Sequence, residues 1–198
     1  YIMEKNPVVQ LKLKQAAENG AKIYVINPVG VEVVNFDFAE KVIYTGNNLD
    51  ALKEIAKYLV DEKDNLSLTN LLELKKSLEN VFVSDEIKEV ASAYNNAKKA
   101  MIVFQENVLS VDAATMIGNI ALVSNHIGAP RDGIVQIKGK NNSQGLVDMG
   151  IDKGIEEMAN VKALLCFGED PCVLGDDILD NLEFVMTVDT HMTDTCKN

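Results

Sequence analysis

Hydrophobic and polar positions along the chain follow two alternating patterns, one typical of amphipathic helices and one typical of buried strands. Apolar residues at helical spacing predict helices over residues 6–20, 48–62, 66–80, 84–99, 110–128, 153–160 and 176–182. Short apolar runs predict strands over residues 21–27, 39–45, 100–105, 162–168 and 183–189, with 39–45 at a sheet edge. The alternation is typical of an α/β protein.

Capping and turn residues mark the ends of several segments. Asn6 is expected to cap the first helix, with Pro7 in its first turn and Gly20 at its end. Ser84 is expected to cap a later helix that carries acidic residues in its first turn, and Gly128 closes the helix after it.

The strands are apolar throughout, which is typical of a parallel sheet covered by helices. We therefore predict Rossmann-like three-layer parallel sheets with helices on both faces and a helical interlude near 48–99. We expect one subdomain over 1–137 and the start of a second over 138–198. Because no strand precedes Asn6, the chain is expected to be a fragment that opens within a β–α–β unit.

Composition narrows the class of protein. The chain has 198 residues, 47% of them hydrophobic and 25% charged, as in ordinary globular proteins. Its net charge of −11 argues against nucleic-acid binding, which needs a basic surface. We find neither a signal peptide nor an apolar run of the roughly 18–20 residues that membrane insertion requires. We expect a cytoplasmic protein, with a peripheral place on a membrane complex as an alternative.

Cysteine and histidine positions fit no metal-binding pattern. Cys166, Cys172 and Cys196 have neither zinc nor iron–sulfur spacing, and an odd number argues against a disulfide framework. We expect a reducing compartment and three cysteines that serve as small apolar or loop residues. His126 and His191 are expected to be structural.

Polar turns follow four of the predicted strands, where parallel α/β folds bind ligands. They begin at Asn27, Gln105, Gly168 and Asp189. Polar residues are common in such loops for solubility alone, so both interpretations stay open. The motifs GxGxxG, GxxxxGK[ST] and GxSxG are absent, which favours a chain that holds a ligand with amides and carboxylates.

The stretch KGKNNSQGLVDMG, residues 138–150, is polar without being of low complexity, and it is expected to be a loop. Together with NPVV, TGNNLDAL, AKKAMIVFQ, FGEDP and VDTHMTDT, it resembles the molybdopterin-dependent oxidoreductases. That family includes formate dehydrogenase alpha subunits and the G chain of NADH dehydrogenase. The similarity runs along essentially the whole chain in family order, and NNSQGLVDMG and GEDP are its most specific parts.

The resemblance implies a bis-(guanylyl molybdopterin) cofactor with molybdenum or tungsten, and iron–sulfur clusters in an N-terminal part absent from this sequence. It places the polar loop near the pterin or its metal through Lys140, Asn141, Asn142 and Gln144. It assigns one guanine nucleotide arm to Asn27, Gly46 and Asn48, and the other arm to Gly168, Glu169, Asp170, Asp189 and Thr190. Alternatively, the loop amides only hold an irregular connection between domains.

Departures from the family pattern concern the substrate. Lys138 stands at the catalytic position where formate dehydrogenases have an arginine, and lysine cannot grip a carboxylate with two parallel hydrogen bonds. Lys140 stands where glutamine is usual, and Asn27-Pro28-Val29 stands where Asp-Pro-Arg is frequent. These changes argue against formate and favour a chain like the G chain of NADH dehydrogenase.

The resemblance further implies an oxidoreductase subunit whose partners are the rest of the parent chain and other electron-transfer subunits. The fragment alone is expected to be inactive. Two alternatives remain. One is a cofactor-free structural domain of a complex-I-like subunit. The other is the middle domain of a thiamine-diphosphate enzyme, which AKKAMIVFQ and NHIGAP resemble but KGKNNSQGLVDMG and GEDP do not.

Overall fold

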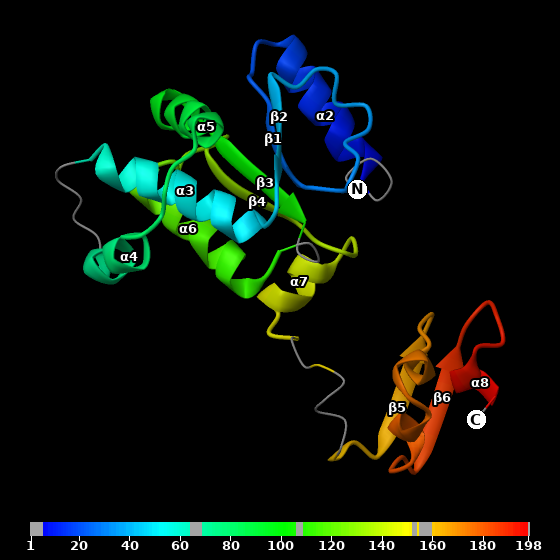
Figure 1. The fold of residues 1–198 in the computed structure, drawn as a ribbon. Helices are drawn as coiled ribbons and strands as arrows, with labels where there is room; N and C mark the ends of the chain where they lie inside the picture. Colours follow the sequence, from blue (N-terminus) through cyan, green and yellow to red (C-terminus); the bar gives the residue numbers. More distant parts are fainter. Residues whose placement is uncertain (1–5, 64–68, 106–108, 152–153, 155–159, 198) are drawn as a thin grey trace. The chain divides into compact units, whose positions relative to one another are not determined.

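The computed structural model describes residues 6–63, 69–105, 109–151, 154 and 160–197 (Figure 1). The chain divides into two compact units, Tyr1–Lys140 and Asn141–Asn198. Helices alternate with short strands that pair in parallel, which confirms the α/β class. The helix predicted over 153–160 falls almost wholly outside the described residues.

The first unit contains two pairs of parallel strands. β1 (Tyr24–Pro28) pairs with β2 (Lys41–Thr45), and β3 (Met101–Gln105) pairs with β4 (Gly133–Ile137). The first three were predicted from sequence. β4 was not, because GIVQI is short, contains a glutamine and exposes its three central residues, so it lacks the continuous apolar run of a buried strand.

Helices cover both sides of these strands. They are α2 (Pro7–Glu18), α3 (Asn48–Asp61), α4 (Leu71–Ser77), α5 (Asp85–Asn96) and α6 (Val111–Ser124). In Figure 1, α2 lies on the side of β1 and β2 opposite α3 and α5. The predicted caps Asn6 and Ser84 make no side-chain capping hydrogen bond, and the Ser84 hydroxyl instead donates to Glu54.

The core of the first unit lies between α3, α5 and α6 and continues onto β1, β2 and β3. Leu59 and Ala56 on α3, Ala91 on α5 and Ile120 on α6 are at most 1% exposed. The amphipathic pattern of α3 predicts this burial, because its apolar residues repeat at three- and four-residue spacing. This core fixes the start of α3 and of α6 relative to the strand ends.

His126 ties three elements of the first unit together and is structural, as expected. Its Nδ1 lies 2.8 Å from Asp132 Oδ1, and its Nε2 lies 2.9 Å from the Tyr94 carbonyl oxygen at the end of α5. The Ala100 N–H, just before β3, donates to the same Asp132 oxygen over 2.9 Å. The ring is 6% exposed, so these contacts are shielded from water.

We expect Asp132 to make the stability of the first unit depend on acid pH. The Ala100 N–H, followed by the His126 ring, holds the pKa of Asp132 below its usual value. A lowered carboxyl pKa contributes stability that is fully present above about pH 4 and is lost as the pH falls through the folded-state value. The free energies of unfolding in urea of the native protein and of Asp132→Asn should therefore differ at pH 7 and become equal toward pH 2–3. An undiminished difference at pH 2 would contradict this assignment.

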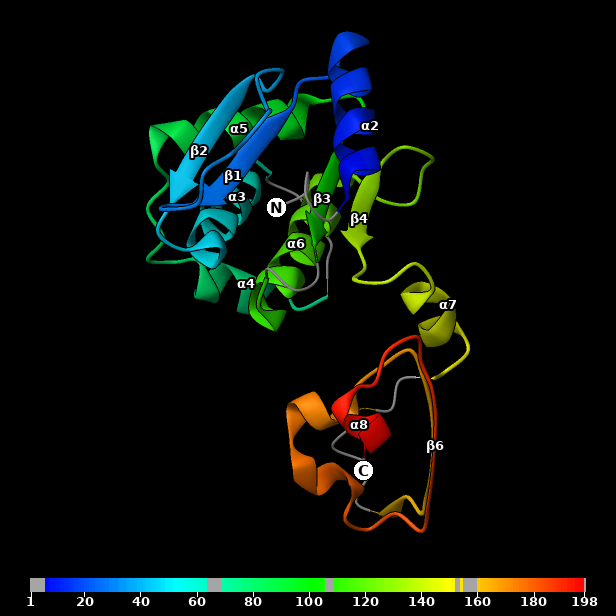
Figure 2. The ribbon, with the colours of Figure 1, turned by 90° about the vertical axis from the view of Figure 1, so that its right-hand side faces the viewer.

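The second unit contains a third parallel pair, β5 (Ala163–Phe167) with β6 (Phe184–Val188), both predicted from sequence. It also contains α7 (Ser143–Asp148), the 3₁₀ helices η3 (Pro171–Leu174) and η4 (Asp176–Leu179), and α8 (Asp194–Lys197). In Figure 2, η3, η4 and α8 lie on one side of β5 and β6. The other face of the pair carries exposed apolar side chains, namely Leu165, Phe167, Phe184 and Met186.

Two predictions for the second unit are wrong. The segment 138–150 is not all loop, since α7 begins at Ser143 despite Gly145, which is a poor helix former in the helix interior. The segment 176–182 is not a full helix, because η4 ends at Leu179 after a single 3₁₀ turn. Short turns of this kind carry too few periodic apolar residues for a sequence pattern to resolve. For the same reason η3 and α8 were not predicted.

Candidate functional site

A pocket of about 240 Å³ opens at the carboxyl ends of β1 and β2. It is lined by Pro28 at the end of β1, by the turn after β2 and the start of α3, and by the start of α6. These lining residues are Pro28, Gly46, Asn47, Asn48, Leu49, Leu109, Ser110 and Ala113. The structure thus brings Gly46 and Asn48, two of the residues predicted from sequence, to one cavity.

Two helices begin at this pocket, each with a side-chain cap. Asn47 Oδ1 accepts the Leu49 N–H over 3.0 Å at the start of α3. Ser110 Oγ accepts the Ala113 N–H over 3.2 Å at the start of α6. The caps satisfy backbone N–H groups that helix starts leave without partners. Sequence analysis missed both residues as pocket residues, although a Ser or Asn directly before an apolar helical pattern could have indicated them.

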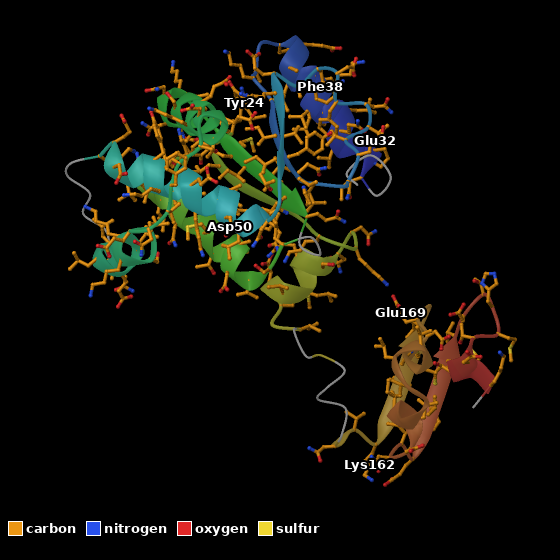
Figure 3. The ribbon with its side chains drawn as sticks, viewed as in Figure 1. Tyr24, Glu32, Phe38, Asp50, Lys162 and Glu169 are labelled. Carbon is orange, nitrogen blue, oxygen red and sulfur yellow. The ribbon has the colours of Figure 1, made fainter. Side chains whose placement is uncertain are left out.

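Two buried oxygen atoms in this region have no hydrogen-bond partner among the described residues. They are Asn48 Oδ1, on a residue that lines the pocket, and Thr45 Oγ1 at the end of β2. Buried acceptors are normally satisfied, so an unpaired one suits a ligand that brings a donor. Asp50, labelled in Figure 3, and Asp112 lie in the first turns of α3 and α6, but both are exposed and neither lines this pocket.

Asn27 lies at the carboxyl end of β1, next to Pro28 of the pocket. Its Nδ2 donates to the Val31 carbonyl oxygen over 2.6 Å and makes a longer contact of 3.4 Å to that of Pro28. The amide nitrogen therefore holds the turn after β1. Asn27 itself does not line the pocket, so its predicted contact with a nucleotide remains a prediction.

Lys138 and Lys140 directly follow β4, Lys138 half-buried and Lys140 exposed. Asn141, Asn142 and Gln144 are exposed at the start of the second unit, and Gln144 Nε2 donates to Asp148 Oδ1 over 2.8 Å along α7. Their predicted roles near a pterin or its metal remain predictions.

The turns after β5 and β6 meet at one end of their strand pair. The Gly168 N–H donates to the Val188 carbonyl oxygen over 2.9 Å, so Gly168–Asp170 and Asp189–Thr190 lie at the same edge. Gly168 has φ of 65°, in the left-handed region that favours glycine. Figure 3 shows Glu169 at this end of β5 and Lys162 at the opposite end. The structure brings these five predicted residues together.

Asp170 has a structural role in this arrangement that sequence analysis did not predict. Its carboxylate accepts the Asp194 N–H over 3.3 Å, the Thr195 N–H over 3.0 Å and the Thr195 hydroxyl. The Thr195 hydroxyl, followed by the Thr195 N–H, lowers the pKa of Asp170. Asp189 Oδ1 similarly accepts the His191 N–H over 3.0 Å. Both carboxylates are thus engaged within the second unit.

Among the described residues, no group of three His, Cys, Asp or Glu side chains is placed to hold a metal ion. No helix in the described part of the chain is long and apolar enough to cross a membrane. In each unit, polar turns lie at the carboxyl ends of parallel strands, where α/β proteins bind ligands.

No protein-family model matches the chain. The alpha subunit of F420-dependent formate dehydrogenase 2 from Methanococcus maripaludis is 25% identical to it over 256 residues, covering 98% of this chain and 38% of that relative. The alpha subunit of F420-dependent formate dehydrogenase from Methanocaldococcus jannaschii matches with the same identity and coverage. Formate dehydrogenase H from Escherichia coli is 25% identical over 167 residues, covering 74% of this chain and 23% of that relative.

These matches identify the chain as a homologue of oxidoreductases. Two of these relatives are alpha subunits of F420-dependent formate dehydrogenases and the third is formate dehydrogenase H, which confirms the resemblance drawn from KGKNNSQGLVDMG and GEDP. The chain spans less than two fifths of the length of these curated relatives.

Proposed function

We propose that this chain is a molybdopterin guanine dinucleotide-binding part of a larger electron-transfer oxidoreductase subunit. The homology to formate dehydrogenase alpha subunits supports the class, and coverage of 38% of their length supports a role as one part of a larger protein. Within such a protein the cofactor would supply redox chemistry at molybdenum or tungsten. The two units would each serve as a cofactor subdomain.

The pocket of the first unit would hold the nucleoside end of one cofactor arm. Its volume of about 240 Å³ lies below the roughly 300–1,000 Å³ of whole small-molecule sites, so it fits part of a ligand. The observation that carries the assignment is the unpaired, buried Asn48 Oδ1. Guanine N–H groups and ribose hydroxyls are donors from which this oxygen can accept a hydrogen bond.

The second arm would lie at the turns after β5 and β6. Gly168 allows close approach of a ligand to the backbone because it carries no side chain, and Glu169 is exposed at the same turn. Asp189 and Thr190 would face the guanine, while Asp170 holds the turn against α8. Lys140, Asn141, Asn142 and Gln144 would lie toward the pterin.

The proposed substrate rests on Lys138, which would stand at the catalytic position. Lysine carries a compact ammonium charge and lacks the planar guanidinium group with which arginine binds a carboxylate through two hydrogen bonds. We therefore propose a substrate other than formate and a parent protein similar to the G chain of NADH dehydrogenase. The parent would carry iron–sulfur clusters in another segment, work with further electron-transfer subunits and reside in the cytoplasm.

Asn48→Ala should weaken the binding of guanosine monophosphate about tenfold without destabilising the chain. Loss of one ligand hydrogen bond of about 1–1.5 kcal/mol accounts for the change in affinity. The fold should be unaffected because Asn48 Oδ1 has no partner among the described residues, and alanine is a good helix former. Equilibrium titration of the 198-residue chain and urea unfolding measure the two effects.

Asn47→Ala is the matched control, since it removes the neighbouring side chain that caps α3. We expect it to lower the free energy of unfolding by about 1 kcal/mol, the usual value for a lost cap. Equal binding by the native protein and Asn48→Ala would reject the proposed contact. Absence of any guanosine monophosphate binding would favour the cofactor-free structural domain.

A further inference from the structure

Both ring nitrogens of His126 face oxygen atoms at hydrogen-bond distance. Nε2 lies 2.9 Å from the Tyr94 carbonyl oxygen, in the last turn of α5, and a carbonyl oxygen can only accept. Nδ1 lies 2.8 Å from Oδ1 of the Asp132 carboxyl group. If this carboxyl group is ionised, each of the two nitrogens needs a proton of its own.

The contacts of Asp132 are those of an ionised carboxyl group. Its Oδ1 also accepts the Ala100 N–H over 2.9 Å, so the same oxygen meets two donors. The Ala100 N–H, followed by the His126 ring, lowers the pKa of Asp132. A neutral ring would therefore leave one nitrogen lone pair against an oxygen lone pair at only 2.8 or 2.9 Å. Two protons on the ring remove this conflict.

On the α5 side the ring faces an uncharged aromatic side chain. The centre of the Tyr94 ring lies 4.8 Å from that of the His126 ring, with an angle of 65° between the ring planes. Burial raises the pKa of the Tyr94 phenol, so this group stays neutral. On the α6 side, the Ser124 hydroxyl accepts the backbone N–H of His126 over 3.4 Å and carries no charge. Asp132 is thus the anion in contact with the ring.

Two lysines of the first unit reach the same region, and backbone carbonyl groups hold them. Lys99, before β3, donates to the Pro130 carbonyl oxygen over 2.7 Å, and its charge also lowers the pKa of Asp132. Lys63, after α3, donates to the Val123 carbonyl oxygen over 2.8 Å. Neither hydrogen bond takes an acceptor away from the His126 ring.

The pair of His126 and Asp132 is shielded from water, with side chains that are 7% and 11% exposed. A buried charge is tolerated where a partner of opposite sign and further hydrogen bonds satisfy it. Here the carboxylate, the Ala100 N–H and the Tyr94 carbonyl oxygen meet these needs. The ring charge therefore has a complete set of partners.

We propose that His126 is an imidazolium ion in the folded first unit and forms a pH-sensitive link between α5 and the segment that leads into β4. With both protons the ring donates to the Tyr94 carbonyl oxygen and to Asp132 at once. After loss of one proton the ring keeps the hydrogen bond to the charged carboxylate, which is the stronger of the two. The hydrogen bond to Tyr94 is then lost, and the end of α5 is released from the ring.

The direction of the pH dependence follows from the number of bound protons. Histidine in an unfolded chain gives up its second ring proton at about pH 6.5. Above that pH the folded unit binds one proton more than the unfolded chain, so the free energy of unfolding falls as the pH rises. In acid the charge of Asp132 is lost instead, with the effect described above. The pair therefore limits the stability of the first unit on both sides of neutral pH.

This link is independent of the proposed cofactor site. His126 follows the end of α6, whereas the pocket adjoins the start of that helix. Its protonation can be measured without any ligand, so the two proposals can fail separately.

The first test observes the ring nitrogens of the ¹⁵N-labelled 198-residue chain by long-range ¹H–¹⁵N NMR at pH 7.5, about one unit above the ordinary histidine value. We expect both nitrogens of His126 to show the chemical shift of protonated nitrogen. His191→Gln leaves a single histidine ring and so assigns the signals. At higher pH, Nε2 should lose its proton while Nδ1 keeps its own. One unprotonated nitrogen at pH 7.5, or loss of the proton from Nδ1 first, would overturn the proposal.

The second test follows urea unfolding of the native chain, His126→Gln and His191→Gln between pH 7 and pH 8.5. The equilibrium constant for unfolding should rise by up to about tenfold per pH unit in the native chain, as expected for one additional bound proton. His191→Gln, the matched control in the second unit, should keep this rise, and His126→Gln should lose it. The same rise in all three proteins would contradict the proposal. NMR of the native chain decides the question even if His126→Gln fails to fold.

Discussion

Leu59→Ala should lower the free energy of unfolding of the unit Tyr1–Lys140 by about 3 kcal/mol, the largest effect that we expect from a single substitution. Leu59 is 0% exposed and lies on α3 between α5 and α6, where its removal leaves a cavity. Urea unfolding followed by tyrosine fluorescence measures this effect. All five tyrosines lie in this unit and the chain has no tryptophan, so the signal reports on the first unit alone.

Leu72→Ala is the matched control, because the same side chain is 77% exposed on α4. Its effect should stay within about 0.5 kcal/mol, as for most surface substitutions. Similar losses for the two variants would show that α3 does not form the centre of the core. The packing of α3 against α6 would then not explain where the pocket lies.

Thr195→Val should destabilise the second unit by about 2 kcal/mol, the second largest effect. Thr195 is 1% exposed, and its hydroxyl donates to the Asp170 carboxylate and accepts the Cys172 N–H. Valine has nearly the same shape, so the substitution removes both hydroxyl hydrogen bonds and takes away the acceptor of the Cys172 N–H, while Asp170 keeps the N–H groups of Asp194 and Thr195. Hydrogen exchange of the Cys172 amide, followed by NMR, measures the opening of this contact.

Thr195→Ser keeps the hydroxyl and removes only a methyl group. We expect protection of the Cys172 amide to be retained in this variant and lost in Thr195→Val. If valine protects the amide as well as threonine does, the Thr195 hydroxyl does not hold η3 against α8.

The long helices and the apolar strands were predicted well, because helices carry an apolar stripe at helical spacing and these strands are short continuous apolar runs. The regular apolar stripe of α3 and the continuous run KALLCFG at β5 are examples. β4 was missed because the pattern of GIVQI is broken by Gln136, and its pairing with β3 is decided by the fold rather than by local preference. Single-turn elements such as α8 depend on distant partners, here Asp170.

The candidate site was predicted in part. Gly46 and Asn48 lie at the pocket, as the position of their turn after a strand suggested. Ser110 reaches the same pocket from a segment more than 60 residues away, which only the packing of α6 against α3 reveals. The hydrogen bonds of Asp170 within the second unit could not be predicted either, because the sequence does not distinguish a turn carboxylate that binds a ligand from one that caps a helix.

The most direct test of the nucleotide site is NMR titration of the ¹⁵N-labelled chain with guanosine monophosphate, with adenosine monophosphate at equal charge as the comparison. We expect saturable shifts at the amides of Gly46, Asn47, Asn48 and Ser110, and weaker binding of the adenine nucleotide, whose base presents fewer donors to Asn48. Shifts that are absent, or that are scattered over the surface and equal for both nucleotides, would contradict the claim that this pocket binds the nucleoside end of the cofactor.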